Sequence, residues 1–448
     1  MSIATHSIGA ALLAGLLTLS LESAAAGAGT ATASVASRGA YLATAGDCMA
    51  CHTAKPAGAG SAAPAPFSGG LPMRSPFGII YSTNITPDRD TGIGNYSLAD
   101  FSRALRHGER RDGSRLYPAM PFASYAALTD ADIADLYAYF EHEVAPVRHR
   151  PPVTALPFPF NQRWAMYFWD AAFVKHAVFQ PHPDRSTQWN RGAYLVQTLG
   201  HCGSCHTPRG LAYQERGSDE SAPLFLTGAT VDDWYSADLT GNRAAGMGRR
   251  SEADLVHFLR HGSGAGDAVF GSMSEVVRDS TQHLTDDDLA AIAAYLKSLP
   301  AHAEVARYAP LVTAVSVTSS LPAGSNLPAR ERAGAGIYSG FCAKCHAESG
   351  AGNPGQFPAL AGNPIVLSAK PTSLLRIVLE GATAPLPESH GSGAAKAEKM
   401  PAFATRLTDQ QIADVVSFIR VSWGNAATPL TVRAVSELRE TLQAHAVK

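Results

Sequence analysis

The stretch AGDCMACHT, residues 45–53, contains two cysteines three positions apart and a histidine directly after the second. A C-x-x-C pair alone is compatible with a redox disulfide, with half of a zinc site or with an attachment point for a larger group. The same pattern occurs three times and accounts for all 6 cysteines of the 448-residue chain. The copies are CMACH (48–52), CGSCH (202–206) and CAKCH (342–346).

The repetition decides between these interpretations. A zinc ribbon needs paired C-x-x-C knuckles about 15–20 residues apart, whereas these pairs are far more widely spaced and three of them cannot be matched evenly. A disulfide would not explain why a histidine follows each pair. Only 16 of the 448 residues are histidine, so chance would seldom place one directly after every pair. The pattern C-x-x-C-H is typical of c-type haem attachment, in which two thiols bind one porphyrin and the imidazole ligates the iron. We therefore expect three covalently bound haem c groups, attached at Cys48, Cys51, Cys202, Cys205, Cys342 and Cys345, with His52, His206 and His346 as axial ligands.

Composition and charge limit the class of protein. Hydrophobic residues make up 46% of the chain and charged residues 17%, which is typical of a globular protein with two to four domains at this length. A formal net charge of −2 gives no case for nucleic-acid binding. There is no nucleophile elbow, Walker loop or dinucleotide fingerprint. We therefore expect no catalytic residues in this chain.

The start of the chain has the pattern of an export signal. Residues 8–21 are apolar and are followed by a run of small residues at 23–27, which predicts a cleaved signal peptide over residues 1–26. The alternative is an uncleaved anchor, but the apolar core is shorter than the roughly 20 residues of a spanning helix. The segment before the core has no Lys or Arg, which departs from the usual pattern. Export fits covalent haem, whose attachment occurs outside the bacterial cytoplasm.

Sequence repeats around the three motifs predict three similar helical units. Before each motif a glycine precedes a tyrosine by two positions: Gly39 and Tyr41, Gly192 and Tyr194, Gly336 and Tyr338. After each motif we expect a helix that ends at glycine, over residues 97–108, 251–262 and 371–381. Each unit is expected to have a second helix that begins at a threonine N-cap. These helices cover residues 128–140, 284–300 and 407–420.

These repeats set the expected domain boundaries at residues 36–150, 188–300 and 328–425. Proline-bearing linkers at 148–164 and 321–330 separate them, and an aromatic-rich stretch at 164–179 predicts a packed crossover. The tail, 426–448, has apolar residues at helical spacing. It predicts a helix that either docks on the protein body or lies in a membrane interface.

The second axial ligand of each iron would decide between catalysis and electron transfer, because His–Met ligation fills both axial positions and raises the potential. Only Met400 lies in the third domain, and Met120 occurs in the first in a similar Met-Pro context. The second domain offers Met247 and Met273. Met273 follows His206 by 67 residues, as Met120 follows His52 by 68, so we predict Met120, Met273 and Met400 as ligands. Lone histidines such as His107, His261 and His390 are expected to be surface or core residues.

Several longer stretches resemble a known family. They are GGLPMRSPFGIIYSTNITPDRDTGIGNYSLADF (69–101), DGSRLYPAMPF (112–122), HCGSCHTPRG (201–210), FGSMSEVV (270–277), FPALAGNP (357–364) and LTDQQIADVVSFIRVSWGN (407–425). The chain resembles the triheme cytochrome c subunit of membrane-associated bacterial dehydrogenases, including quinoprotein alcohol dehydrogenase and flavin-dependent gluconate and sugar dehydrogenases. The resemblance implies an all-α fold of three tandem class I cytochrome c-like domains. The family's ligand positions fall on the residues predicted above.

The resemblance also implies a role and partners. The chain would be a non-catalytic subunit at the periplasmic face of the cytoplasmic membrane, with peripheral membrane association. It would take electrons from a catalytic subunit carrying pyrroloquinoline quinone or flavin, or from a molybdenum hydroxylase, and pass them to ubiquinone. Two alternatives are a free-standing periplasmic electron shuttle and a multihaem enzyme such as a peroxidase.

Overall fold

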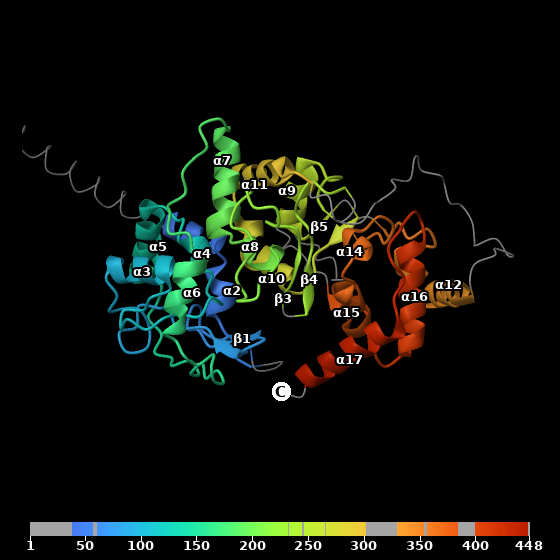
Figure 1. The fold of residues 1–448 in the computed structure, drawn as a ribbon, viewed down its shortest axis with the longest axis horizontal. Helices are drawn as coiled ribbons and strands as arrows, with labels where there is room; N and C mark the ends of the chain where they lie inside the picture. The colour runs from blue at the N-terminus through green and yellow to red at the C-terminus, as the bar shows by residue number, and fades with distance from the viewer. Residues whose placement is uncertain are drawn as a thin grey trace, which may run out of the picture.

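The computed structural model describes residues 38–56, 61–231, 233–243, 246–264, 266–301, 329–353, 356–383 and 399–446. The chain folds into three units that lie side by side in chain order along the long axis of the molecule (Figure 1). We call residues 38–142 unit one, residues 187–298 unit two and residues 329–421 unit three. The predicted export signal, residues 1–26, lies outside the described residues.

Unit one is a set of helices with one small hairpin. A helix over residues 38–45 comes first. It is followed by α2 (Cys48–His52), the antiparallel strands β1 (Pro72–Ser75) and β2 (Gly78–Tyr81), α3 (Leu98–His107), α4 (Phe122–Tyr125) and α5 (Asp130–His142). The crossover to unit two contains α6 (Ala165–Phe173).

Unit two repeats this order with additions. Its elements are α7 (Thr187–Tyr194), a π-helical turn (Leu195–Leu199), α8 (Gly203–His206), β3 (Ala229–Val231), β4 (Trp234–Ser236), α9 (Glu252–His261), β5 (Ser263–Gly264), β6 (Asp267–Ala268), α10 (Ser272–Asp279), a 3-10 turn (Thr281–His283) and α11 (Asp286–Ser298). The strands form two antiparallel hairpins.

Unit three is the shortest version of the same order. Its elements are α12 (Ala329–Phe341), α13 (Ala343–His346), α14 (Pro364–Leu367), α15 (Thr372–Glu380), β7 (Ala382–Thr383), β8 (Lys399–Met400) and α16 (Asp409–Val421), and α17 (Val432–Ala446) follows it. The largely helical architecture agrees with the predicted all-α class, and the small hairpins are additions that the sequence did not predict.

The helix ends lie where capping residues predicted them. Ser97 and Ser251 form capping boxes with the residue three positions on, at the starts of α3 and α9. Gly108 and Gly262 end these helices in the left-handed conformation, with φ of 57° and 70°. A threonine N-cap opens each of α5, α11 and α16. These local signals, each satisfying orphan backbone N–H or C=O groups, fix the helices that surround each C-x-x-C-H loop.

The first helix of each unit packs on the last helix at a glycine. A β-carbon at Gly39 would lie 2.1 Å from the Asp135 carbonyl oxygen, and one at Gly192 would lie 1.9 Å from the Ala291 carbonyl oxygen. The corresponding residue of unit three is Gly334, where a β-carbon would lie 2.3 Å from the Asp414 carbonyl oxygen. A β-carbon at Gly336 would meet nothing within 4 Å. The sequence alignment of Gly336 with Gly39 and Gly192 is therefore wrong by two positions.

Units one and two share a hydrophobic core, whereas unit three has its own. Buried side chains of the first helix, α5, α7 and α11 belong to one continuous cluster that includes Leu42, Leu136 and Tyr295. The cluster of unit three includes Tyr338, Leu375 and Phe418. Unit three is joined to unit two by polar contacts, among them the Ser373 hydroxyl, which accepts from the Tyr235 N–H at 2.7 Å.

The tail helix α17 docks on unit three. Val435 is fully buried, and Leu438 and Leu442 pack against the same core. The Arg439 guanidinium binds the Asp409 carboxylate at 2.7 Å. The apolar face of α17 is therefore occupied by the protein, as in the docked alternative. No helix among the described residues is both long enough and apolar enough to cross a membrane.

Candidate haem sites

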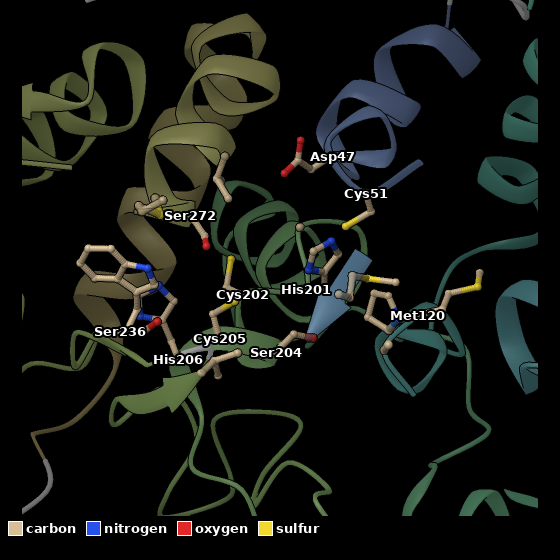
Figure 2. A pocket seen from close by; sticks show the side chains of 18 of the residues that line it. Asp47, Cys51, Met120, His201, Cys202, Ser204, Cys205, His206, Ser236 and Ser272 are labelled. Carbon is tan, nitrogen blue, oxygen red and sulfur yellow. The ribbon is translucent and has the colours of Figure 1, made fainter. Parts of the chain in front are cut away.

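One connected cavity runs through the three units. It has a volume of about 1300 Å³ and is lined by every predicted site residue except Cys345. Figure 2 shows Cys51 and Met120 of unit one facing the same hollow as Cys202, Cys205 and His206 of unit two. The structure therefore brings together attachment loops and methionines that lie far apart in the sequence.

The histidine of each motif is held by its Nδ1 atom. This atom lies 2.7 Å from the Thr83 carbonyl oxygen in His52, 2.7 Å from the Ala237 carbonyl oxygen in His206 and 2.9 Å from the Pro358 carbonyl oxygen in His346. Because a carbonyl oxygen only accepts, Nδ1 carries the proton and Nε2 keeps its lone pair. Burial also lowers the pKa of all three imidazoles, which favours the neutral form. Each histidine is thus prepared to donate Nε2 to a metal.

The cysteines are free thiols, all but Cys345 at the wall of the cavity, with Cys51 and Cys205 exposed and the other four partly buried. None of the six, all of which the structure describes, forms a disulfide. Burial raises the pKa of Cys48, Cys51 and Cys202 to about 12 and that of Cys342 to about 11. Such thiols are protonated at neutral pH, so they suit neither nucleophilic catalysis nor a preformed metal site. Covalent attachment to a porphyrin uses both thiols of each pair.

Local geometry relates Met273 to Met120. The Leu116 N–H donates to the Gly108 carbonyl at 2.7 Å, and Met120 comes four residues later. The same bond joins the Val269 N–H to the Gly262 carbonyl at 2.7 Å, and Met273 again comes four residues later. In the part of the chain that the structure describes, Met247 follows no such turn.

Met247 and Met400 have other settings. Met247 packs against the core shared by units one and two, and its N–H donates to Thr240 at 2.8 Å, although its side chain also lines the cavity. Met400 lies in β8 opposite Ala382, the first residue after the glycine that ends α15. Met400 therefore lines the cavity from a strand next to the end of α15, and not from a turn like those that precede Met120 and Met273. Two free thiols, an imidazole Nε2 and a cavity-lining thioether in each unit fit a covalently attached haem.

Comparison with known proteins gives the family. A sequence model described as cytochrome c matches residues 36–142, 190–300 and 331–423. The gluconate 2-dehydrogenase cytochrome c subunit of Pantoea cypripedii is 46% identical over 416 residues, which cover 91% of this chain and 90% of that protein. This chain belongs to the family of dehydrogenase cytochrome c subunits.

Two further relatives have the same kind of name. The cytochrome c subunit of alcohol dehydrogenase (quinone) from Gluconacetobacter polyoxogenes is 45% identical, over 90% of this chain and 84% of its own length. The fructose dehydrogenase cytochrome subunit of Gluconobacter japonicus is 39% identical, over 90% of this chain and 82% of its own. The predicted resemblance is confirmed at the level of the subunit family.

In this cytochrome subunit the C-x-x-C-H loops of units one and two face each other, which the sequence did not predict. The Tyr125 hydroxyl donates to the Gly46 carbonyl at 3.3 Å, and the Tyr125 and His201 rings meet edge to face at 5.7 Å. Lys55, beside the first loop, pairs with Glu275 of α10. The one available signal was the near repetition of RGAYL before both motifs, at 38–42 and 191–195.

Asp47, next to Cys48, has a setting that the sequence did not indicate. Its Oδ1 is buried with no hydrogen-bond partner. Burial, with help from the nearby Asp279 and Glu275, raises the pKa of this carboxyl to about 8. The carboxyl group next to Cys48 is therefore largely protonated at neutral pH.

Proposed function

We propose that this chain is an exported triheme c-type cytochrome that serves as the electron-transfer subunit of a membrane-associated dehydrogenase. It would accept electrons from a catalytic subunit with pyrroloquinoline quinone or flavin and deliver them to ubiquinone at the periplasmic face of the cytoplasmic membrane. The names of the relatives, which are cytochrome subunits of gluconate, alcohol and fructose dehydrogenases, support a dehydrogenase partner. The observation that carries the proposal is the single cavity lined by three C-x-x-C-H loops, each with its histidine Nδ1 held by a carbonyl.

The roles of the residues follow from their chemistry. Haem iron, when bound, supplies one-electron redox chemistry. The cysteine pairs would attach the porphyrins, and Nε2 of His52, His206 and His346 would be one axial donor. Met120, Met273 and Met400 would be the other. Two protein ligands on each iron would leave no open position for peroxide, which favours electron transfer over a peroxidase activity.

The crossover between units one and two is the region that we propose contacts the membrane. Phe158, Trp164 and Phe168 are 79%, 65% and 67% exposed. We define the crossover surface as the exposed side chains Val153, Phe158, Phe160, Trp164, Tyr167, Phe168 and Phe173. A contiguous sequence segment so rich in exposed aromatic side chains is unusual for a surface in water and typical of a membrane interface.

Two features connect this surface with the proposed acceptor. The side chains of Arg148 and Lys175, which flank it in sequence, are 77% and 74% exposed. Each also pairs with an aspartate, Asp90 and Asp219, so their attraction for anionic headgroups is partly offset. Phe160 and Met166 of the same crossover line the cavity. A lipid-soluble quinone would therefore find the cavity next to the membrane. The tail helix α17 is a weaker candidate, because its apolar face is covered by unit three.

The test of the redox role uses the full protein exported with its haem. Mass spectrometry should find three haems, and the Cys342→Ser/Cys345→Ser variant should carry two. A tagged chain recovered from gently solubilised membranes should bring a quinoprotein or flavoprotein dehydrogenase with it. Recovery of the chain alone would contradict a fixed complex, and a ferric spectrum altered by cyanide or peroxide would favour the enzyme alternative.

Membrane contact is tested separately with vesicles of phosphatidylethanolamine and phosphatidylglycerol. The holoprotein should co-sediment with them, and the Trp164→Ser/Phe168→Ser variant should do so several-fold less. Leu98→Ser removes an exposed apolar side chain elsewhere, at the start of α3, and should change nothing. Equal binding by all three proteins would move the contact away from the crossover surface.

A further inference from the structure

Three potential metal ligands meet between unit one and the crossover. His107 is the last residue of α3, Asp170 lies in α6 and His176 follows α6 closely. One ligand atom from each lies within 4.8 Å of the others. His176 Nε2 is 3.1 Å from Asp170 Oδ2, and the two imidazole rings are stacked with centroids 4.4 Å apart. None of the three residues lines the haem cavity.

The burial pattern of α6 is the reverse of what its residue types predict. Tyr167, Phe168 and Phe173 are exposed, while Asp170 is the one buried residue of the helix, at 7% exposure. Burial of an aspartate is costly unless its charge is paired or bound to a metal. The packing of α6 therefore directs a carboxylate, rather than an apolar side chain, towards α3.

That carboxylate is only partly satisfied. Oδ2 faces His176 and lies 3.7 Å from Arg115 Nη1, but Oδ1 is buried without a hydrogen-bond partner. An unpaired buried carboxylate oxygen carries a desolvation cost that a bound cation would remove. Oδ1 is thus the second, independent sign that a ligand belongs here.

The charges around the cluster allow a cation. Arg115 is the one cationic side chain that contacts Asp170 in the described structure, and it is itself shared with Glu109 at 3.4 Å. Arg115 would weaken binding without preventing it.

We propose that His107, Asp170 and His176 bind a divalent transition-metal ion of the zinc class. Two imidazole nitrogens and one carboxylate oxygen are a common donor set for Zn²⁺, with solvent in the fourth position at the exposed His176. The ion would fasten α6 to the end of α3. It would thereby hold the crossover surface in a fixed orientation on unit one.

Unit two offers a natural control. His261 ends α9 as His107 ends α3, and its ring lies beside that of His257 in a tilted arrangement, with centroids 4.5 Å apart. Among the residues that the structure describes, only the His107 group combines three such ligands. Paired histidines without a buried carboxylate can therefore be compared directly with the full set.

The experiment uses the haem-loaded protein, stripped with a chelator and titrated with zinc chloride by calorimetry. We expect one zinc ion per chain after dialysis, counted by elemental analysis. Asp170→Asn and His176→Gln should each weaken zinc binding at least tenfold, while His257→Gln/His261→Gln should leave it unchanged. Zinc should also raise the unfolding temperature of the wild type and the control, but not of the two site variants.

Each other outcome overturns the proposal. No bound zinc in the wild type would mean that Asp170, Arg115 and His176 form only an ion-pair network. Zinc bound equally well by the His176→Gln variant would place the ion elsewhere. Because His176 is exposed, its substitution should not disturb folding, and an unchanged haem spectrum in that variant verifies this independently.

Discussion

Tyr41 of unit one donates its hydroxyl to Asp288 of unit two, with 2.6 Å between the oxygens. The reverse contact is also present, because the Tyr194 hydroxyl of unit two donates to Asp132 of unit one at 2.5 Å. The two contacts are related as they would be at the interface of a symmetric dimer. Unit three has Gly336 at the position that corresponds to Tyr41, two residues after the packing glycine, so it cannot join this exchange.

The first prediction concerns this reciprocal contact. Tyr41→Phe should lower the free energy of unfolding by about 1.5–3 kcal/mol, the usual range for a hydrogen bond to a charged group. In a double-mutant cycle, Tyr41→Phe and Asp288→Asn should be strongly non-additive. Denaturant unfolding of the holoprotein, followed by circular dichroism, measures both effects.

Tyr137→Phe is the matched control for the exchange between units. Tyr137 donates to the Tyr96 carbonyl within unit one at 2.8 Å, so its loss should not couple to Asp288→Asn. Additive behaviour of Tyr41→Phe and Asp288→Asn would mean that the contact does not hold the units together.

The second prediction is a dependence of stability on pH. Burial alone would raise the pKa of Asp288, but hydrogen bonds from Arg191 and Tyr41 outweigh it and keep this pKa below its ordinary value. A carboxyl with a lowered pKa in the folded state stabilises that state above the pKa of the unfolded chain, about 3.9. This contribution is lost as the pH falls through the folded-state pKa. The interface should therefore weaken in acid below about pH 4.

Unfolding temperatures measured between pH 3 and pH 7 test this. Asp288→Asn should lower stability at pH 7 and flatten the acid limb of the curve. Asp286 lies on the same helix α11 and pairs with Arg260, but its side chain is 92% exposed and the pair is screened by water, so Asp286→Asn should change the shape of the curve little. An equally steep acid limb in Asp288→Asn would assign the acid sensitivity to other groups.

The third prediction separates two glycines of α12. Gly334→Ala places a β-carbon 2.3 Å from the Asp414 carbonyl oxygen, so we expect a loss of about 1–3 kcal/mol from overpacking. Gly336→Ala meets nothing within 4 Å and should gain up to about 1 kcal/mol from helix propensity. Thermal unfolding of unit three measures both, and equal effects would show that α12 packs on α16 elsewhere.

Sequence reasoning succeeded where the signal is local. A threonine N-cap or a C-cap glycine satisfies backbone groups of its own helix, so α3, α5, α9, α11 and α16 could be located without knowledge of tertiary contacts. The C-x-x-C-H motif is equally local, because the chemistry of attachment requires those residues at that spacing. The sequence could not align Gly334 with Gly39, because only the close approach of two distant helices identifies the packing glycine.

Contacts between distant segments were also beyond the sequence. Unit two has one more residue between Gly192 and Cys202 than unit one has between Gly39 and Cys48. The wider π-helical turn at Leu195–Leu199 accommodates this residue. The exchange of Tyr41 and Tyr194 depends on the docking of two units. The His107 group joins segments more than sixty residues apart, which neither its spacing nor its residue types indicated.

The last prediction concerns the second axial ligand in unit two. Met273 lies four residues after the turn that closes on Gly262, as Met120 lies after the turn that closes on Gly108, whereas the Met247 N–H itself donates to the Thr240 carbonyl. Since a thioether ligand raises the potential of haem iron, Met273→Leu should lower one midpoint potential by on the order of 0.1 V. All three haems should stay attached, because the cysteines are untouched. Met247→Leu should leave all potentials unchanged, and a redox titration in which this variant shifts while Met273→Leu does not would reverse the assignment.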